Sequence, residues 1–222
     1  MVNTIFIFAS LYGVLSQVQK IKRRKKLKVK GGATQLLSIN LFTVSYLAYF
    51  TFFIYGYSIK PFNHYIVWPR LIAAILVGFI LYEIWLERRT KYSASSFILV
   101  FLSLVFGIVV MIYGDNVIDE GKYVSTSLIL VISILLAQGY YHQIKLIMQS
   151  GATGAVELKM SQLIFMMDIS TIAFAFSMEI NTGWPLMVLA FTSAATKIII
   201  MYLFKWVRVS SVARQRRRKY PF

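Results

Sequence analysis

The chain contains no cysteine and only two histidines, and each shortage excludes a class of chemistry. Without cysteine there are no disulfides, thiolate metal sites or thiol nucleophiles. The histidines, His64 and His142, are far apart in the sequence, so we expect neither a metal site nor a cofactor. No G-x-S-x-G, H-E-x-x-H or Walker pattern occurs, and the sequence therefore does not predict an enzyme.

Charged side chains are also scarce, at 14% of the 222 residues against about 25% in a typical soluble domain. Apolar runs near 20 residues recur along the whole chain, which is the length that crosses a bilayer as a helix. The sequence therefore predicts an all-α membrane protein. The first run has no charged n-region and no A-x-A-like cleavage site, so we expect a retained helix rather than a signal peptide.

Seven spans can be placed from these runs. They cover residues 2–19, 34–57, 66–86, 95–114, 124–148, 160–180 and 184–206. Basic residues gather in alternate connections: "KIKRRKKLKVK" carries eight Lys or Arg, "ERRTKYS" three, and the tail "ARQRRRKYPF" five. The positive-inside rule then predicts an N-terminus outside and a cytoplasmic C-terminus.

The formal net charge of +16 would suggest nucleic acid in a soluble protein. Here the basic runs flank membrane spans, so we expect them to contact the anionic head groups of the bilayer. No folded domain or stacking platform supports nucleic-acid binding. Nothing in the sequence decides between a monomer and a homo-oligomer.

Similar motifs recur in the same order in the two halves of the chain, which predicts an internal repeat. "GVLSQVQKI" (13–21) matches "GYYHQIKLI" (139–147), and the third span of each half opens with Trp-Pro. Aligning Ala33 with Ala155 puts Asn40 opposite Gln162. The predicted organisation is a three-helix repeat at 1–87, a linker helix with flanking loops at 88–123, a second three-helix repeat at 124–208, and a basic cytoplasmic tail at 209–222.

The loop entries "SQVQKIKRRKKLKVKGGATQLLS" and "HQIKLIMQSGATGAVELKM" resemble those of the PQ-loop/SWEET superfamily of seven-span transporters, over essentially the full chain. The name-giving Pro-Gln pairs correspond to Ser16-Gln17 and His142-Gln143, so both glutamines are kept and both prolines are absent. The resemblance implies two parallel three-helix bundles around a solute path that opens alternately to each side. Sugar carriers of the family use an asparagine in the third and seventh spans; neither span has one here.

Two charged residues are predicted to lie inside the membrane. Asp168 lies about eight residues into its span, or ~12 Å deep, and Lys197 lies about 13 residues from the outer end of the last span, or ~20 Å. Neither charge tolerates lipid and their depths are similar, so we expect both to face the space between the repeats, within reach of each other directly or through water. Whether the pair only locks two helices, or meets the solute or a coupling proton, stays open.

Other polar side chains are candidates for secondary roles. Hydroxyls of Ser193 and Thr196 share the Lys197 helix, and amides of Asn40 and Gln162 could bridge helices or bind solute. Arg70 and Glu83, near opposite ends of the third span, are expected to snorkel to the interfaces. Gln17, Gln143 and His142 are expected to gate the cytoplasmic mouth, and four tyrosines could line a path: Tyr46, Tyr49, Tyr140 and Tyr141.

These features favour a secondary transporter for a small polar or charged solute of the amino acid, vitamin or sugar class, working by alternating access. Symport with a proton carried by Asp168 is compatible with the pattern. The alternative is a seven-helix receptor or retinal-binding photoreceptor that uses Lys197, since a lysine in a last span is also typical of retinal proteins. A sorting receptor would need more charge in the outer loops than the sequence provides. The sequence does not name the substrate.

Overall fold

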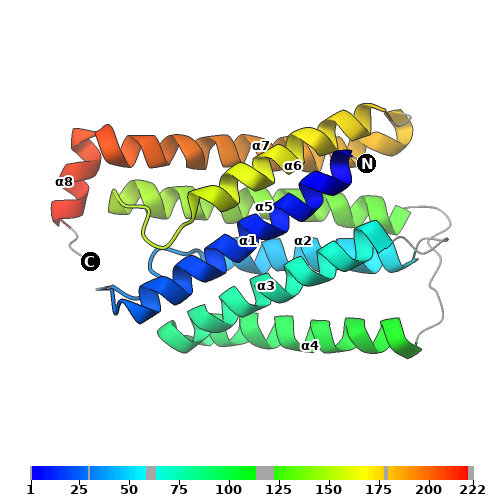
Figure 1. The fold of residues 1–222 in the computed structure, drawn as a ribbon, viewed down its shortest axis with the longest axis horizontal. Coiled ribbons are helices and arrows are strands. Elements are labelled where there is room, and N and C mark those ends of the chain that lie inside the picture. The colour runs from blue at the N-terminus through cyan, green and yellow to red at the C-terminus, as the bar shows by residue number, and fades with distance from the viewer. Residues whose placement is uncertain (1, 30, 59–63, 114–122, 178–179, 220–222) are drawn as a thin grey trace.

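The computed structural model of the chain describes residues 2–29, 31–58, 64–113, 123–177 and 180–219. Within these ranges the regular structure is entirely helical (Figure 1). The helices are α1 (Val2–Lys26), α2 (Ile39–Ser58), α3 (His64–Arg88), α4 (Lys91–Tyr113), α5 (Tyr123–Ser150), α6 (Leu158–Phe176), α7 (Ile180–Val209) and α8 (Ser211–Lys219).

Six of the described helices are long and apolar enough to cross a membrane, and α2 is apolar over the shorter stretch Ile39–Ile54. The prediction of an all-α, multi-pass membrane protein is confirmed at this level. Several helices begin or end away from the expected residues, and α1, expected at 2–19, continues to Lys26. The span expected at 34–57 begins only at Ile39, because Leu36 has a positive φ of 62° that a right-handed helix excludes. The basic tail contains a short helix, α8, that was not predicted.

The helices pack in two similar groups. In one group α3 contacts α2 and α1, and in the other α7 contacts α6 and α5. The groups meet where α1 packs on α6 and where α5 packs on α2. Helix α4 lies at the edge of the bundle against α3 and α2, and its described buried residues are Ser93, Val100 and Gly107 (Figure 1). Most of its apolar surface therefore faces outward, where lipid would lie.

Two glycines let the groups approach closely. A Cβ atom at Gly13 would stand 3.2 Å from the Met160 Cα on α6, and one at Gly139 would stand 3.0 Å from the Leu41 Cα on α2. Such distances are tighter than ordinary side-chain contacts, so both crossings depend on the missing side chain. The helix pairs involved, α1 with α6 and α5 with α2, are the ones that join the two groups.

One end of the bundle is strongly basic. Helices α1, α3, α5 and α7 end there, α8 lies across it, and the connecting segments 31–38 and 151–157 lie beside each other (Figure 1). The last turns of α1 and α8 supply four Lys or Arg side chains each. We call this end, made by residues 20–29, 31–38, 88–91, 145–159 and 205–219, the basic end.

Candidate functional site

A pocket of about 90 Å³ lies inside the bundle, lined by α2, α3, α5, α6 and α7. One water needs roughly 10–15 Å³ of such space, so several waters or a small solute fit. Both helix groups contribute to its wall. Its charged lining residues, within the part of the chain that the structure describes, are Asp168, Lys197 and Arg70. The structure thus brings the two expected membrane charges to one space, together with a third that was not expected.

Asp168 is supplied by α6, a helix that begins at Leu158 after its N-cap Glu157. At 1.5 Å per residue Asp168 lies ~15 Å along this helix, near its middle. The side chain is 4% exposed, and the Ser193 side chain lies close enough to interact with its carboxylate. The carboxylate oxygen Oδ2 is buried without a hydrogen-bond partner in the described part of the chain. A buried acceptor left unpaired is rare in folded proteins and calls for an explanation.

Lys197 is 2% exposed and comes from α7, the helix that packs beside α6. Its Nζ donates to the Tyr140 hydroxyl and, over 3.4 Å, to the Ser193 Oγ. Lys197 and Asp168 act on each other electrostatically, but no direct ion pair joins them in the described part of the chain. The two charges therefore share a pocket, with Ser193 between them, rather than forming a closed structural lock.

Arg70 contradicts the expectation that it snorkels to an interface. It lines the pocket, with its guanidinium 5.7 Å from the Tyr49 ring centre and 5.3 Å from that of Phe52. Among the described residues it has no hydrogen bond and no ion pair, although a guanidinium carries five donors. The prediction from sequence position failed because an arginine near a helix end usually extends to water. Only the direction of the side chain, which sequence does not give, reveals its place.

The expectation for Glu83 is also wrong. Glu83 is 7% exposed, and its Oε2 accepts a hydrogen bond of 2.7 Å from Lys25 Nζ. Because Lys25 comes from the last turn of α1, the pair joins α1 to α3 at the basic end. Glu83 therefore takes part in the packing of the first helix group, where its side chain is buried rather than extended to water, and it does not line the pocket.

The remaining candidates divide between the pocket and other places. Ser193, Tyr49 and Tyr140 line the pocket. Thr196 does not, and its hydroxyl bonds the Ser193 carbonyl over 2.7 Å. Tyr46 bonds Ser103 on α4, and Tyr141 is exposed. Asn40 and Gln162 are exposed near the starts of α2 and α6, so the structure does not bring either amide to the pocket.

Gln17 and Gln143 hold the segments that precede α6 and α2. Gln17 Nε2 donates to the Ala155 carbonyl and its Oε1 accepts from the Glu157 N–H, both over 2.8 Å. Gln143 Nε2 donates to the Leu36 carbonyl over 2.7 Å, and its Oε1 accepts from the Ser38 N–H over 2.8 Å. We call these four hydrogen bonds of the two glutamines the clasp.

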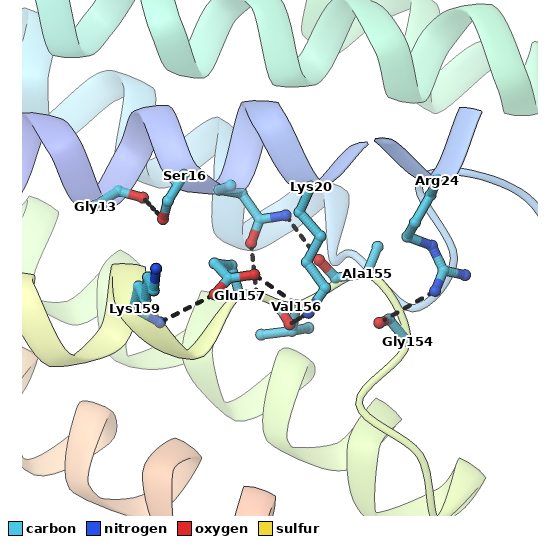
Figure 2. A network of polar contacts seen from close by, with 10 residues as sticks. Gly13, Ser16, Lys20, Arg24, Gly154, Ala155, Val156, Glu157 and Lys159 are labelled. Atoms are coloured by element: carbon cyan, nitrogen blue, oxygen red, sulfur yellow. Dashed lines mark hydrogen bonds and ion pairs between the residues drawn. The ribbon is translucent and has the colours of Figure 1, made fainter. Parts of the chain in front are cut away.

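The clasp is buried and reinforced. Gln17 is 1% exposed and Gln143 is fully buried. Beside Gln17, Lys20 bonds the Val156 carbonyl over 2.6 Å and Arg24 the Gly154 carbonyl over 3.4 Å (Figure 2). The exposed His142 places its Nδ1 3.2 Å from the Ser38 hydroxyl at the edge of the other half.

The clasp favours a different alignment of the two halves from the expected one. The two glutamines make the same pair of bonds to Leu36 and Ser38 as to Ala155 and Glu157. This equivalence aligns Leu36 with Ala155, three residues away from the alignment of Ala33 with Ala155. Asn40 is then not opposite Gln162, and Asp168 corresponds instead to Tyr49.

A smaller cavity of about 20 Å³ lies between the pocket and the clasp. Its wall includes both clasp glutamines and also Lys197, Tyr140 and Met160, the residues that it shares with the pocket. The hydrogen-bonded pair of Lys197 and Tyr140 thus stands between the two cavities. The small cavity therefore extends from this pair, which also lines the pocket, to the glutamines of the clasp.

Comparison with known proteins adds no further constraint. No protein-family model, curated protein or solved structure matches the chain. The candidate site rests on the arrangement of this chain's own residues: a pocket between two helix groups, three charges, and hydrogen-bonding groups left unpaired inside an apolar bundle.

Proposed function

We propose that the protein is a secondary transporter that moves a small charged solute through the pocket by alternating access. The observation that carries the proposal is the pocket between the two helix groups with Asp168, Lys197 and Arg70 in its wall. Ionisable groups inside a membrane are expensive and typically mark solute or ion pathways. An unpaired buried carboxylate oxygen fits a site that receives a donor from a solute, a proton or water.

We further propose the parallel 3+1+3 plan of the PQ-loop/SWEET superfamily, with α4 as the linker. The equivalent crossings of α1 on α6 and of α5 on α2 support it, as do the two glycines at those crossings. The equivalent bonds of Gln17 and Gln143 give independent support. Each pair of features relates the first half to the second in the same chain direction, as a parallel repeat requires.

In this proposal the clasp closes the basic end of the path. The two halves would rock apart there, breaking the bonds of Gln17 and Gln143 and joining the small cavity to the pocket. The buried amides exchange one set of partners for water when the path opens, so the cost of opening is limited. Lys197 and Tyr140 would separate to let the solute pass.

Ligand screening followed by uptake tests the proposal. The purified protein is screened by thermal shift against amino acids, carboxylic acids, vitamins, sugars and nucleosides, because a ligand at about 100 Kd stabilises by ~2.7 kcal/mol. Each hit is then followed into proteoliposomes with and without a pH gradient. Saturable uptake supports transport, and acceleration by an inward proton gradient supports symport. Binding without any uptake or counterflow would refute the transporter.

The proposed orientation, with the basic end in the cytoplasm, has its own test. The natural chain lacks cysteine, so single cysteines report cleanly. Ser177→Cys and Gln149→Cys place a thiol at exposed positions near opposite ends of the bundle. An impermeant maleimide should label position 177 in intact cells and position 149 only after permeabilisation. The reverse pattern would invert the orientation.

The retinal alternative has one supporting feature, a lysine and a carboxylate in one pocket. Retinal binding would convert the Lys197 amine to a Schiff base. Adding retinal to the purified protein should then produce a visible absorbance band that is absent from Lys197→Met. The transporter proposal predicts no such band in either protein.

A further inference from the structure

The pocket has an excess of positive charge. With ionised side chains, Arg70 and Lys197 contribute two positive charges and Asp168 one negative charge, which leaves a net charge of +1 among the described lining residues. Lys197 is already hydrogen-bonded to Tyr140 and faces Asp168 across Ser193. Arg70 is half-buried and, among the described residues, has no hydrogen bond and no direct ion pair, although Asp168 also attracts it electrostatically. An uncompensated charge inside an apolar bundle is costly, so an anion in the pocket would be favoured.

The geometry of Arg70 suggests which anion fits. Its guanidinium is held over the rings of Tyr49 and Phe52, which fix its position without using its N–H donors. A planar fork of free donors matches a carboxylate, which accepts two parallel hydrogen bonds. A lysine ammonium is a point charge, so it would not favour a planar carboxylate in this way.

A second polar contact is available at Asp168. Its Oδ2 is buried, faces no donor in the structure, and belongs to a side chain in the pocket wall. Oδ2 can accept one hydrogen bond from a solute. The remaining wall is largely apolar, with Ile164, Met167, Leu186 and Leu189 among its members. The pocket therefore presents a carboxylate receptor, one acceptor, and an apolar surface.

We propose that the solute is a small monocarboxylate with one hydrogen-bond donor and an apolar body. Its carboxylate lies on the Arg70 guanidinium and its donor, a hydroxyl in the simplest case, on Asp168 Oδ2. A monoanion brings the net charge of the pocket to zero, whereas a zwitterionic amino acid leaves it at +1. This inference rests on the proposed transporter function and narrows its substrate class.

Four probes of nearly equal shape test the proposal by thermal shift on the purified full-length protein. They are 2-hydroxy-4-methylpentanoate, 4-methylpentanoate, leucine, and the neutral 2-hydroxy-4-methylpentanamide. The hydroxy acid should bind tightest, the plain acid roughly 3- to 10-fold more weakly for loss of one hydrogen bond, and the amide not measurably. Binding of the amide as tight as the acid would overturn the carboxylate contact. Leucine binding tighter than the hydroxy acid would overturn the charge balance.

Variants of Arg70 locate the contact. Arg70→Gln should weaken binding of the hydroxy acid by roughly 10- to 100-fold, as expected for loss of a charge-assisted pair, and Arg70→Lys should recover part of it. The matched control is Arg23→Gln, which removes the same charge from an exposed side chain at the basic end. The elution profile and the melting temperature of each variant, both measured without ligand, verify that it is folded. Wild-type affinity in Arg70→Gln would refute the assignment.

Failure of this inference is distinguishable from failure of the transporter proposal. If none of the four probes binds but a sugar, nucleoside or cationic amino acid binds and is taken up, the carboxylate assignment is wrong and transport stands. If the hydroxy acid binds at Arg70 but is never carried across a proteoliposome membrane, the site is right and the protein is not its transporter.

Discussion

The clasp and the pocket are both polar, buried and built from the two helix groups, but they differ in whether their polar side-chain atoms have hydrogen-bond partners. In the clasp each glutamine side chain uses both its oxygen and its nitrogen on backbone groups of the opposite half. In the pocket one oxygen of Asp168 and the guanidinium of Arg70 have no hydrogen-bond partner among the residues that the structure describes. The clasp lies at the basic end, and the pocket lies deeper in the bundle.

This difference separates polar groups that stabilise the fold from polar groups that are available to a ligand. A saturated amide stabilises the fold, because breaking it exposes buried backbone donors and acceptors. A buried charged group without hydrogen-bond partners destabilises the fold, and it is retained where a ligand supplies the missing partners. We therefore expect substitutions in the clasp to change stability with little effect on ligand preference, and substitutions in the pocket to do the reverse.

The largest expected effect is in the clasp. Gln143→Leu leaves the Leu36 carbonyl and the Ser38 N–H without partners in a fully buried place, which should cost about 2–4 kcal/mol of stability. Thermal unfolding of the purified protein measures it. Gln162→Leu is the matched control, because Gln162 is exposed and should change stability by less than ~0.5 kcal/mol. Equal losses in the two variants would remove the distinction between clasp and surface.

The next effect is in the pocket. Asp168→Asn keeps the size of the side chain but removes the charge, and should lower uptake of the transported solute about 10- to 100-fold. Stability should fall by less than the ~3–5 kcal/mol typical of breaking a dry ion pair, because Asp168 and Lys197 are not in direct contact. Uptake into proteoliposomes and thermal unfolding of the same preparation give both numbers.

The double variant Asp168→Asn with Lys197→Met sharpens this result. Removing both charges should restore stability, since neither charge is left without the other. Uptake should stay low if the pair acts on the solute. Recovery of uptake as well as stability would show that the two charges serve only to hold helices together, as the clasp does.

Much of the fold could be predicted from the sequence, because membrane spans depend on composition over some 20 residues. The apolar runs placed the helices α1 and α3 to α7, and the repeated Gly13 and Gly139 lie at equivalent crossings. The prediction failed for the residues at which some helices begin or end. The start of α2 at Ile39 depends on the left-handed backbone at Leu36, which no propensity for leucine suggests.

The candidate site was predictable only in part. A carboxylate and an ammonium in apolar helices are conspicuous, because hydrocarbon tolerates neither, and Asp168 and Lys197 do share a pocket. Arg70, Asn40 and Gln162 were misplaced because their predicted roles depend on which side of a helix faces inward. Near the end of a span an interior arginine and a snorkelling one have the same sequence, and only tertiary packing separates them.

The smallest expected effect is at the two helix crossings that join the halves. Gly139→Ala puts a Cβ 3.0 Å from the Leu41 Cα, and Gly13→Ala puts one 3.2 Å from the Met160 Cα. Overpacking of this kind costs ~1–3 kcal/mol, and the better helix propensity of alanine returns up to ~1 kcal/mol. A net loss of about 1 kcal/mol is expected in each, slightly larger at Gly139. Thermal unfolding measures both, with Gly78→Ala as a control whose Cβ would meet only side-chain atoms of α4, nearest at 3.0 Å. If neither crossing variant is less stable than the control, close backbone approach does not explain why a glycine recurs at this position in both halves.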